Sequence, residues 1–348
     1  MTLHRLLTFS LAIVAVLLGG VLPGCADATS DSEGATAGTL IVYCGRTKGN
    51  VESVIAAFEQ ATGITAEVRY GDTAQLAVTL KEEGGKSPAD VFWAQDAGAL
   101  GAVADEGLLA KLPQPIIDTV PPLFRNASGY WVATSGRARV IAYAARPDFD
   151  PAIIPSSVLD LPAVEALHGR LGWAPHNGSF QAFVTAMRHV HGDERTRQWV
   201  RDMIAAGAKA YPKNTPIIEA IAAGEIDAGL PNHYYLLRFL ADDPNYPVAQ
   251  KMFGPGDVGN LVNVAGIAIV GASDNRPAAE RFIEFMLSPQ AQRIFAQQVY
   301  EYPVIDGVDT SDALMSFDAL LEHAPEIDLE ALDDLEGTLR LLQDEGAL

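Results

Sequence analysis

Two adjacent aromatic residues, Tyr234 and Tyr235, offer the most evident chemistry in this chain. A strand is expected to end at Leu230, and Asn232 can cap a helix that begins with the pair. Adjacent side chains at the start of a helix diverge by only about 100°. Two phenol oxygens can therefore converge on one point, although a tyrosine pair taken alone is more often part of a packed core.

The residues that precede the pair predict alternating strands and helices. Apolar residues within 50–62 recur at helical spacing, and Gly63 ends that helix. A βαβαβα order predicts an α/β fold whose parallel sheet has right-handed crossovers. The expected strands are 40–43, 64–70 and 90–93, and the expected helices are 50–62, 72–81 (capped by Asp72) and about 96–106.

Two long β-rich stretches, 130–144 and 260–270, are expected to pass between two lobes. A ligand cleft between two such lobes is a common arrangement. We expect one lobe to comprise 39–136 and 262–310, and the other to comprise 137–261 and 311–348. The remaining expected strands are 169–174 and 226–230, and the remaining helices are 179–191, 196–206, 215–223, one from Asn232, 277–287, 289–298 and acidic segments within 311–342.

The first 24 residues predict a secretion signal, because an apolar run of about sixteen residues follows Arg5 and is short for a membrane span. Cys25 follows a small residue, as in a bacterial lipobox, so we expect Cys25 to be lipidated. Cleavage nearby without a lipid, or a retained anchor, is the alternative. Residues 25–38 are small, polar and acidic, which predicts a flexible tether. Contact with a membrane is expected only through this anchor, and Cys44 is expected to be a small buried residue.

The composition of the chain, and the lack of complete catalytic or nucleotide-binding motifs, argue against several functions. The chain has 348 residues and a formal net charge of −20, so an acidic surface would repel nucleic acid. Gly85-Lys86-Ser87 lacks the earlier glycine of a phosphate-binding loop. The glycines within 254–259 precede a strand instead of opening a helix, which argues against a dinucleotide site. Neither a zinc-protease motif nor a nucleophile elbow is present, so we expect a protein that is not an enzyme.

Seven short blocks carry a family resemblance, and they are Leu40–Arg46 (LIVYCGR), Ser87–Trp93 (SPADVFW), Thr134–Tyr143 (TSGRARVIAY), Tyr211–Asn214 (YPKN), Asn232–Tyr235 (NHYY), Val264–Ile269 (VAGIAI) and Glu301–Val304 (EYPV). In order and spacing they resemble the bacterial periplasmic ferric-ion-binding proteins (FbpA type) of iron ABC transporters. The resemblance implies a two-lobed type II periplasmic binding protein fold. Each lobe would be a mostly parallel sheet flanked by helices, with two crossover strands as the hinge. It also implies a monomer that closes on Fe³⁺ as cargo and delivers it to an ABC permease.

The resemblance implies that Tyr234 and Tyr235 bind the metal. Phenolate is a hard anionic oxygen donor and suits Fe³⁺. A free tyrosine loses its proton only near pH 10, so binding at neutral pH must release protons. Many family members add a histidine and a glutamate, but the matching positions here are Thr47 and Gln95. Asp96 or His233 could contribute instead, and water or a bound anion must complete the shell.

The resemblance also implies a small anion, carbonate or phosphate, held at helix N-termini. The helix starts that fit this role contain Asn177, Gly178, Ser179, Asn214 and Asn232. Each of them can equally be a simple helix cap. Further candidate partners of the anion are Arg46, Ser135 and Arg137, which could instead form ion pairs at the surface or the hinge.

Two other functions stay open on the sequence alone. The same fold could bind another small solute, such as a polyamine, thiamine or an oxyanion. Alternatively, the protein could be an interaction or adhesion lipoprotein without a working site. In each case a location in the periplasm or at the outer cell surface is expected.

Overall fold

The computed structural model describes residues 39–348, except for the side chain of Glu330. The expected signal segment 1–24, Cys25 and the tether 25–38 lie outside the described residues. Within 39–348, no helix has both the length and the apolar character needed to cross a membrane.

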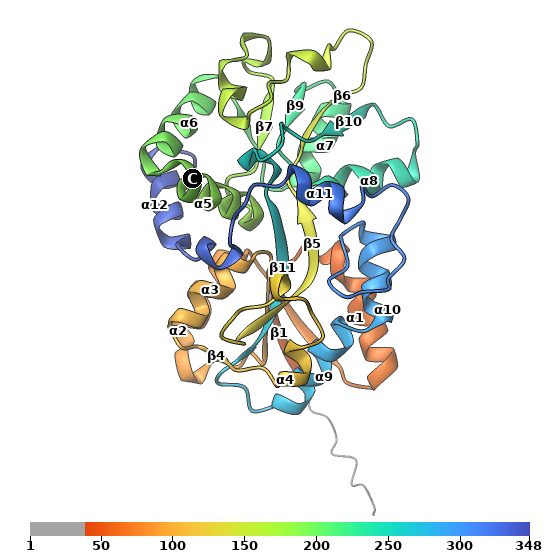
Figure 1. Cartoon of the computed structure of the whole chain (residues 1–348). Helices are drawn as coiled ribbons and strands as arrows, with labels where there is room; N and C mark the ends of the chain where they lie inside the picture. Colours follow the sequence, from red (N-terminus) through yellow and green to blue (C-terminus); the bar gives the residue numbers. More distant parts are fainter. Residues whose placement is uncertain (1–38) are drawn as a thin grey trace, which may run out of the picture. The chain divides into compact units, whose positions relative to one another are not determined.

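The first sheet has the strand order β2-β1-β3-β11-β4, with β5 paired to β11 (Figure 1). Strand β1 runs parallel to β2 and β3, whereas β11 runs antiparallel to β3, β4 and β5. The strands are β1 (Leu40–Cys44), β2 (Ala66–Tyr70), β3 (Val91–Ala94), β4 (Leu109–Ala110), β5 (Trp131–Ala138) and β11 (Val262–Val270). The helices of this part are α1 (Lys48–Thr62), α2 (Thr73–Glu83), α3 (Ala97–Asp105), α4 (Gln114–Ile117), α9 (Arg276–Met286) and α10 (Pro289–Ile294).

The second sheet has the order β10-β6-β9-β7-β8. Strand β7 runs parallel to β8 and β9, and β6 runs antiparallel to β9 and β10. The strands are β6 (Ile141–Ala144), β7 (Leu171–Trp173), β8 (Lys209–Ala210), β9 (Ala228–Gly229) and β10 (Val248–Lys251). The helices here are α5 (Gly178–His191), α6 (Asp193–Ala205), α7 (Asn214–Ala222) and α8 (His233–Asp242).

Both sheets are therefore mixed, and the expectation of mostly parallel sheets holds only around β1 and β7. The physical reason is the path of the chain. Strands β5 and β11 run in opposite directions because one leaves the first sheet and the other returns to it. Antiparallel pairs therefore accompany the parallel βαβ units in each sheet.

Strands β5 and β11 form the expected passage between the two sheets (Figure 1). Their register runs from Ala138 opposite Val262 to Trp131 opposite Ala268. Beyond Ala138 the chain continues into β6, so the β-rich stretch 130–144 is two strands in two different sheets. The boundaries of the lobes at 136/137 and 261/262 stay a prediction.

Gly136 lets a third segment cross the ribbon of β5 and β11. It forms an isolated bridge with Tyr302, and a Cβ added at Gly136 would lie 3.3 Å from the Cβ of Tyr302. That separation is tighter than ordinary contact, so glycine is what allows residues around 302 to lie against β5.

The last part of the chain contains α11 (Phe317–His323), a short 3₁₀ turn (Leu329–Leu332) and α12 (Leu335–Asp344). Helix α12 contacts α5 and α6, which lie beside the second sheet, and also α3, which lies beside the first sheet. The 3₁₀ turn packs on α3 as well, where the absence of a side chain at Gly98 makes room for the Leu332 carbonyl.

Candidate functional site

Tyr234 and Tyr235 lie in the first turn of α8 with their rings side by side. The ring centroids are 4.3 Å apart, and the ring planes differ by 31°. The two residues are 0% and 2% exposed, yet neither hydroxyl has a hydrogen-bond partner. A buried polar group without a partner is costly. The pair is therefore not ordinary core packing, in which each hydroxyl would be bonded.

Other buried polar atoms around the pair also lack partners. They include Nε and Nη1 of both Arg46 and Arg137, and both side-chain polar atoms of Gln95. The two guanidinium groups act electrostatically on Tyr234. Native proteins leave few such atoms unpaired. Their concentration here indicates a polar space that a charged ligand would fill.

Glu301 joins Arg46 and Ser135 in a buried cluster beside the pair. Both carboxylate oxygens of Glu301 lie 2.7 Å from Nη2 of Arg46, and the Ser135 hydroxyl donates to the same carboxylate. The side chains of Arg46 and Glu301 are both 0% exposed. The preceding residue, Tyr300, has φ 63°, a left-handed conformation that a non-glycine residue adopts only under constraint.

A second cluster links three of the helix starts expected to hold an anion. Asn177 accepts hydrogen bonds from the backbone and hydroxyl of Ser179, at 3.1 Å and 2.6 Å, and from Asn214 at 3.4 Å. Asn232 donates to the Ser179 hydroxyl at 3.2 Å. The structure thus brings the starts of α5, α7 and α8 together. Asn232 occupies the cap position of α8, but its side chain does not cap that helix as expected, because it bonds Ser179 instead.

Arg139 lies at the centre of this second cluster. Its guanidinium donates to the backbone carbonyls of Ser179 and Leu230, with the Ser179 contact at 2.8 Å. Burial, and then the charge of Arg137, lower the pKa of Arg139 to about 9. Burial also lowers the pKa of Arg137. In both residues burial is the largest cause, and for Arg137 the charges of Glu301 and Asp96 offset it only in part.

The pKa of Tyr234 is raised well above its ordinary value. Burial is the main cause, followed by the negative charges of Tyr235 and Glu301, whereas Arg46 and Arg137 oppose the shift. The phenol of Tyr234 therefore stays protonated until a cation compensates its charge.

Of the positions that replace the family's histidine and glutamate, Gln95 lies at the site and Thr47 lies at its edge. Arg137 donates to the Gln95 backbone carbonyl, while the amide side chain of Gln95 is buried and unpaired. Thr47 precedes α1 and lines a cavity that Tyr235 also lines.

Asp96 caps α3, and its Oδ1 accepts from the Ala99 backbone at 2.8 Å. Its other oxygen faces the start of α5, because a Cβ added at Gly178 would lie 3.1 Å from it. Burial raises the pKa of Asp96 to about 6, against the lowering effects of the Ala99 hydrogen bond and Arg137.

His233, which the sequence offers as a further metal ligand, has both ring nitrogens in contact with backbone groups in this structure. Its Nδ1 accepts from the Ala138 backbone at 3.1 Å, and its Nε2 lies 2.8 Å from the Tyr300 carbonyl. Both ring nitrogens are therefore in contact with backbone groups. Burial lowers the pKa of His233, which favours the neutral ring.

The sequence interpretation missed Glu301 and Arg139. Glu301 was part of a recognised block, but no spacing argument tied it to Arg46, which lies 255 positions away. Arg139 lies two residues after Arg137, so the basic pair in the crossover strand was the available signal.

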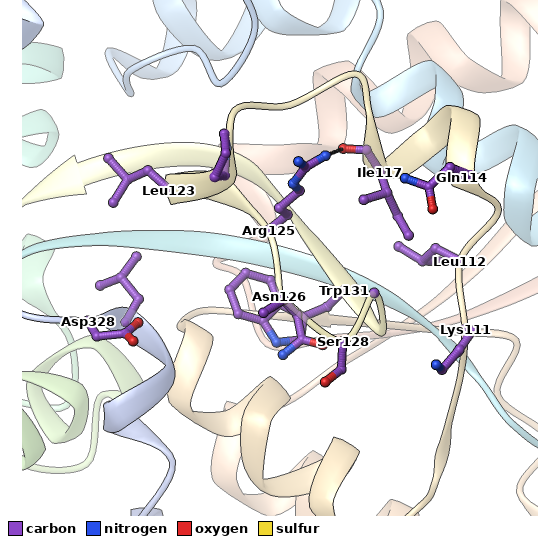
Figure 2. A pocket seen from close by; sticks show the side chains of 14 residues that line it. Lys111, Leu112, Gln114, Ile117, Leu123, Arg125, Asn126, Ser128, Trp131 and Asp328 are labelled. Carbon is purple, nitrogen blue, oxygen red and sulfur yellow. Dashed lines mark hydrogen bonds between the residues drawn. The ribbon is translucent and has the colours of Figure 1, made fainter.

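No group of three or more His, Cys, Asp or Glu side chains that could hold a metal exists in residues 39–348. The two tyrosine hydroxyls are oxygen donors of the kind that a hard metal ion prefers once they lose their protons. A separate cavity of about 580 Å³ lies between the 111–131 segment and residues 328–329 (Figure 2). There Arg125 is turned to the Ile117 carbonyl, at 2.8 Å, and the lining contains none of the residues around the tyrosines.

Known proteins resemble this chain over nearly its whole length. The major ferric iron-binding protein of Neisseria meningitidis serogroup B is 32% identical over 96% of this chain and 97% of its own length. Iron-bound HitA from Pseudomonas aeruginosa is 32% identical, with a TM-score of 0.83 over 89% of this chain and 99% of that one. The IdiA (FutA) protein of Trichodesmium, in complex with iron and citrate ligands, is 26% identical, with a TM-score of 0.70 over 89% and 99% of the two chains.

Residues 53–321 also match the family described as bacterial extracellular solute-binding proteins. The two-lobed fold of these relatives is the one seen in residues 39–348. This chain therefore belongs to the bacterial extracellular solute-binding proteins.

Proposed function

We propose that this protein captures ferric iron between its two lobes, with Tyr234 and Tyr235 as metal ligands, and delivers the iron to an ABC permease. The observation that carries the proposal is the pair of buried phenol groups that have no partner. Relatives over nearly the whole chain are named ferric iron-binding and Fe(3+)-binding proteins. The protein acts by binding and release, not by catalysis.

A small dianion completes the site in this proposal. A ferric ion held by two phenolates keeps one net positive charge, and Arg137 and Arg139 each add another, because neither has a carboxylate partner among residues 39–348. Glu301 forms its ion pair with Arg46. Carbonate or phosphate at the starts of α5, α7 and α8 would neutralise two of these three positive charges and fill the metal's open positions.

The arginine cluster also bears on the other solutes. Polyamines and thiamine are cations, and burying them beside Arg46, Arg137 and Arg139 is unfavourable. An oxyanion without a metal suits the arginines but leaves both phenol groups unpaired. The ferric ion with an anion is therefore the ligand that satisfies both halves of the site.

The family to which the chain belongs is extracellular, so the protein works outside the cytoplasm. We further propose that Cys25 carries a lipid anchor, that the segment after it is a tether, and that the folded body is a monomer.

A spectral titration tests the proposed function. Metal-free protein receives ferric iron with bicarbonate, and a visible phenolate-to-iron charge-transfer band is expected. The double variant Tyr234→Phe/Tyr235→Phe should lose the band, and each single variant should shift and weaken it. Tyr246→Phe is the matched control, because its ring stacks on Phe239 away from the pair. A band that survives in the double variant would refute the assignment of the ligands.

A further inference from the structure

The cavity of about 580 Å³ that Trp131 helps to line lies apart from the proposed iron site (Figure 2). We refer to it as the Trp131 cavity. Small-molecule sites in proteins typically measure about 300–1,000 Å³, so this cavity has room for an organic ligand. Its lining combines apolar side chains, among them Leu112, Ile117 and Leu329, with polar and charged ones.

Trp131, the first residue of β5, carries the clearest indication of a ligand. It is 1% exposed, and its indole nitrogen Nε1 is buried without a hydrogen-bond partner. Two other buried indoles of this chain do have partners. Nε1 of Trp93 donates to the Thr134 hydroxyl at 3.0 Å. Nε1 of Trp199 donates to the Val158 carbonyl at 2.9 Å. A buried tryptophan N–H usually finds an acceptor, so the Trp131 N–H is an exception that a ligand would remove.

The charged side chains of the lining are two cations and one carboxylate, Asp328. Lys111 forms no ion pair with a carboxylate of residues 39–348, and its amino group lies 5.7 Å from the centre of the Tyr130 ring. Arg125 pairs at 3.2 Å with Asp118, which is outside the lining and has a side chain that is 60% exposed. Such an exposed pair is weak. In a chain with a net charge of −20, an excess of positive charge is a local feature that favours an anionic ligand.

The apolar part of the lining indicates that this ligand is organic. Leu123 is 47% exposed and lines the cavity together with Leu112 and Ile117. A single exposed leucine is ordinary on a protein surface. This one, however, shares a cavity with an unpaired indole N–H and two cations. An inorganic anion would leave the apolar contacts unused, so the ligand that fits has an apolar body as well as a negative charge.

We propose that the Trp131 cavity is a second binding site, separate from the iron site, for an organic anion with an apolar body, such as an aromatic carboxylate. The carboxylate accepts a hydrogen bond from the Trp131 N–H and is attracted by Lys111 and Arg125. The apolar body packs on Leu112 and Leu123. Because Nε1 is buried, the carboxylate reaches it after a small shift of side chains, which is common on binding. The inference does not depend on the proposed function, since the cavity has no lining residue in common with the tyrosine site.

Isothermal titration calorimetry of the full-length protein with 2-naphthoate tests this proposal. Metal-free protein, and protein incubated with ferric iron and bicarbonate, are titrated in parallel. One 2-naphthoate should bind per chain, with the same affinity in both samples, because the cavity is separate from the tyrosines. The neutral analogue naphthalene-2-carboxamide has the same ring system without the charge and should bind about 10-fold more weakly or less.

Four variants connect the binding to this cavity. Trp131→Phe keeps an aromatic ring, removes the N–H and should lower the affinity about 10- to 100-fold, the loss expected for a hydrogen bond to a charged group. Lys111→Gln should lower it only about 2- to 5-fold, because the amino group is exposed. Leu123→Asp, at an exposed position, places a negative charge against the ligand and should weaken binding more than Lys111→Gln does. Lys86→Gln, at an exposed lysine outside the lining, is the matched control and should change nothing.

Melting temperatures show which variants are folded, and Leu123→Asp keeps the test decisive if Trp131→Phe is unstable. The proposal is overturned if metal-free protein does not bind 2-naphthoate, or if the folded variants at Trp131 and Leu123 bind it as wild type does. It is also overturned if iron loading or Tyr234→Phe/Tyr235→Phe abolishes the binding, since the anion would then lie at the tyrosines. A missing charge-transfer band with iron, by contrast, overturns the proposed function and leaves this inference intact.

Discussion

Replacing Glu301 with glutamine tests how the site's charges are balanced. Both side chains of the Arg46–Glu301 pair are fully buried, and each carboxylate oxygen is 2.7 Å from the guanidinium. Glutamine keeps the size and removes the charge. Arg46 then becomes a buried cation without compensation, since two of its nitrogens already lack partners. Removing one member of a buried pair typically costs about 3–5 kcal/mol.

That cost is large enough to measure by thermal unfolding of the metal-free protein. At about 2–4 °C per kcal/mol for a domain of this size class, Glu301→Gln should lower the melting temperature by about 6–20 °C. The double variant Arg46→Met/Glu301→Gln removes both charges and should recover most of the loss, because apolar replacement of a buried pair is often nearly neutral.

The refuting result is specific. A loss below about 1 kcal/mol in Glu301→Gln would mean that Arg46 finds another acceptor or is hydrated. A double variant as unstable as the single one would show that packing, not charge, determines the effect. The matched control Glu284→Gln alters a pair whose side chains are 51–61% exposed and should change stability by less than about 1 kcal/mol.

Three other changes have defined outcomes. Asp227→Asn should cost about 1–3 kcal/mol of stability near pH 7, because hydrogen bonds from Arg170 and then Arg146 lower the pKa of Asp227. This stability is present above the unfolded pKa of about 3.9 and is lost as the pH falls through the folded value. The free energies of unfolding of wild type and variant, measured with urea, should therefore converge in acid. Cys44, whose pKa burial raises to about 12, should resist alkylation in the native protein and react once denatured, as mass spectrometry of its peptide would show; rapid native labelling would contradict its burial. Gly98→Ala places a Cβ against the Leu332 carbonyl and should expose residues 311–348 to limited proteolysis, whereas Gly101→Ala, with 3.2 Å to the Asp333 Cβ, should do so much less.

Much of the first half of the fold followed from periodicity and caps. Helix α1 ends where Gly63 takes φ 72°, as its position predicted. Asp72 precedes α2 as expected but its side chain makes no capping hydrogen bond, whereas Asp96 caps α3 without having been predicted to do so. The split of 130–144 into strands of two sheets could not be read from its residues, because the whole stretch is uniformly β-rich. Only the tertiary path separates β5 from β6.

The site was predictable where one short motif carried it. The tyrosine pair and the helix starts depend on local sequence, and the structure brings them together. The charge balance was not predictable, since Glu301 meets Arg46 from a distant part of the chain. The contacts of His233 were not predictable for a related reason, because both of its partners are backbone groups that no residue type reveals.

The final helix also constrains how the cleft can open. Because α12 and the 3₁₀ turn before it touch α3 on one side and α5 on the other, bending the β5–β11 ribbon is not enough by itself. If the two halves separate, the C-terminal segment has to release or shift its contacts with at least one of them. Gly98 and Gly101 give α3 a smooth surface at that contact. The ease of iron release would then depend partly on a contact surface that contains none of the proposed metal ligands.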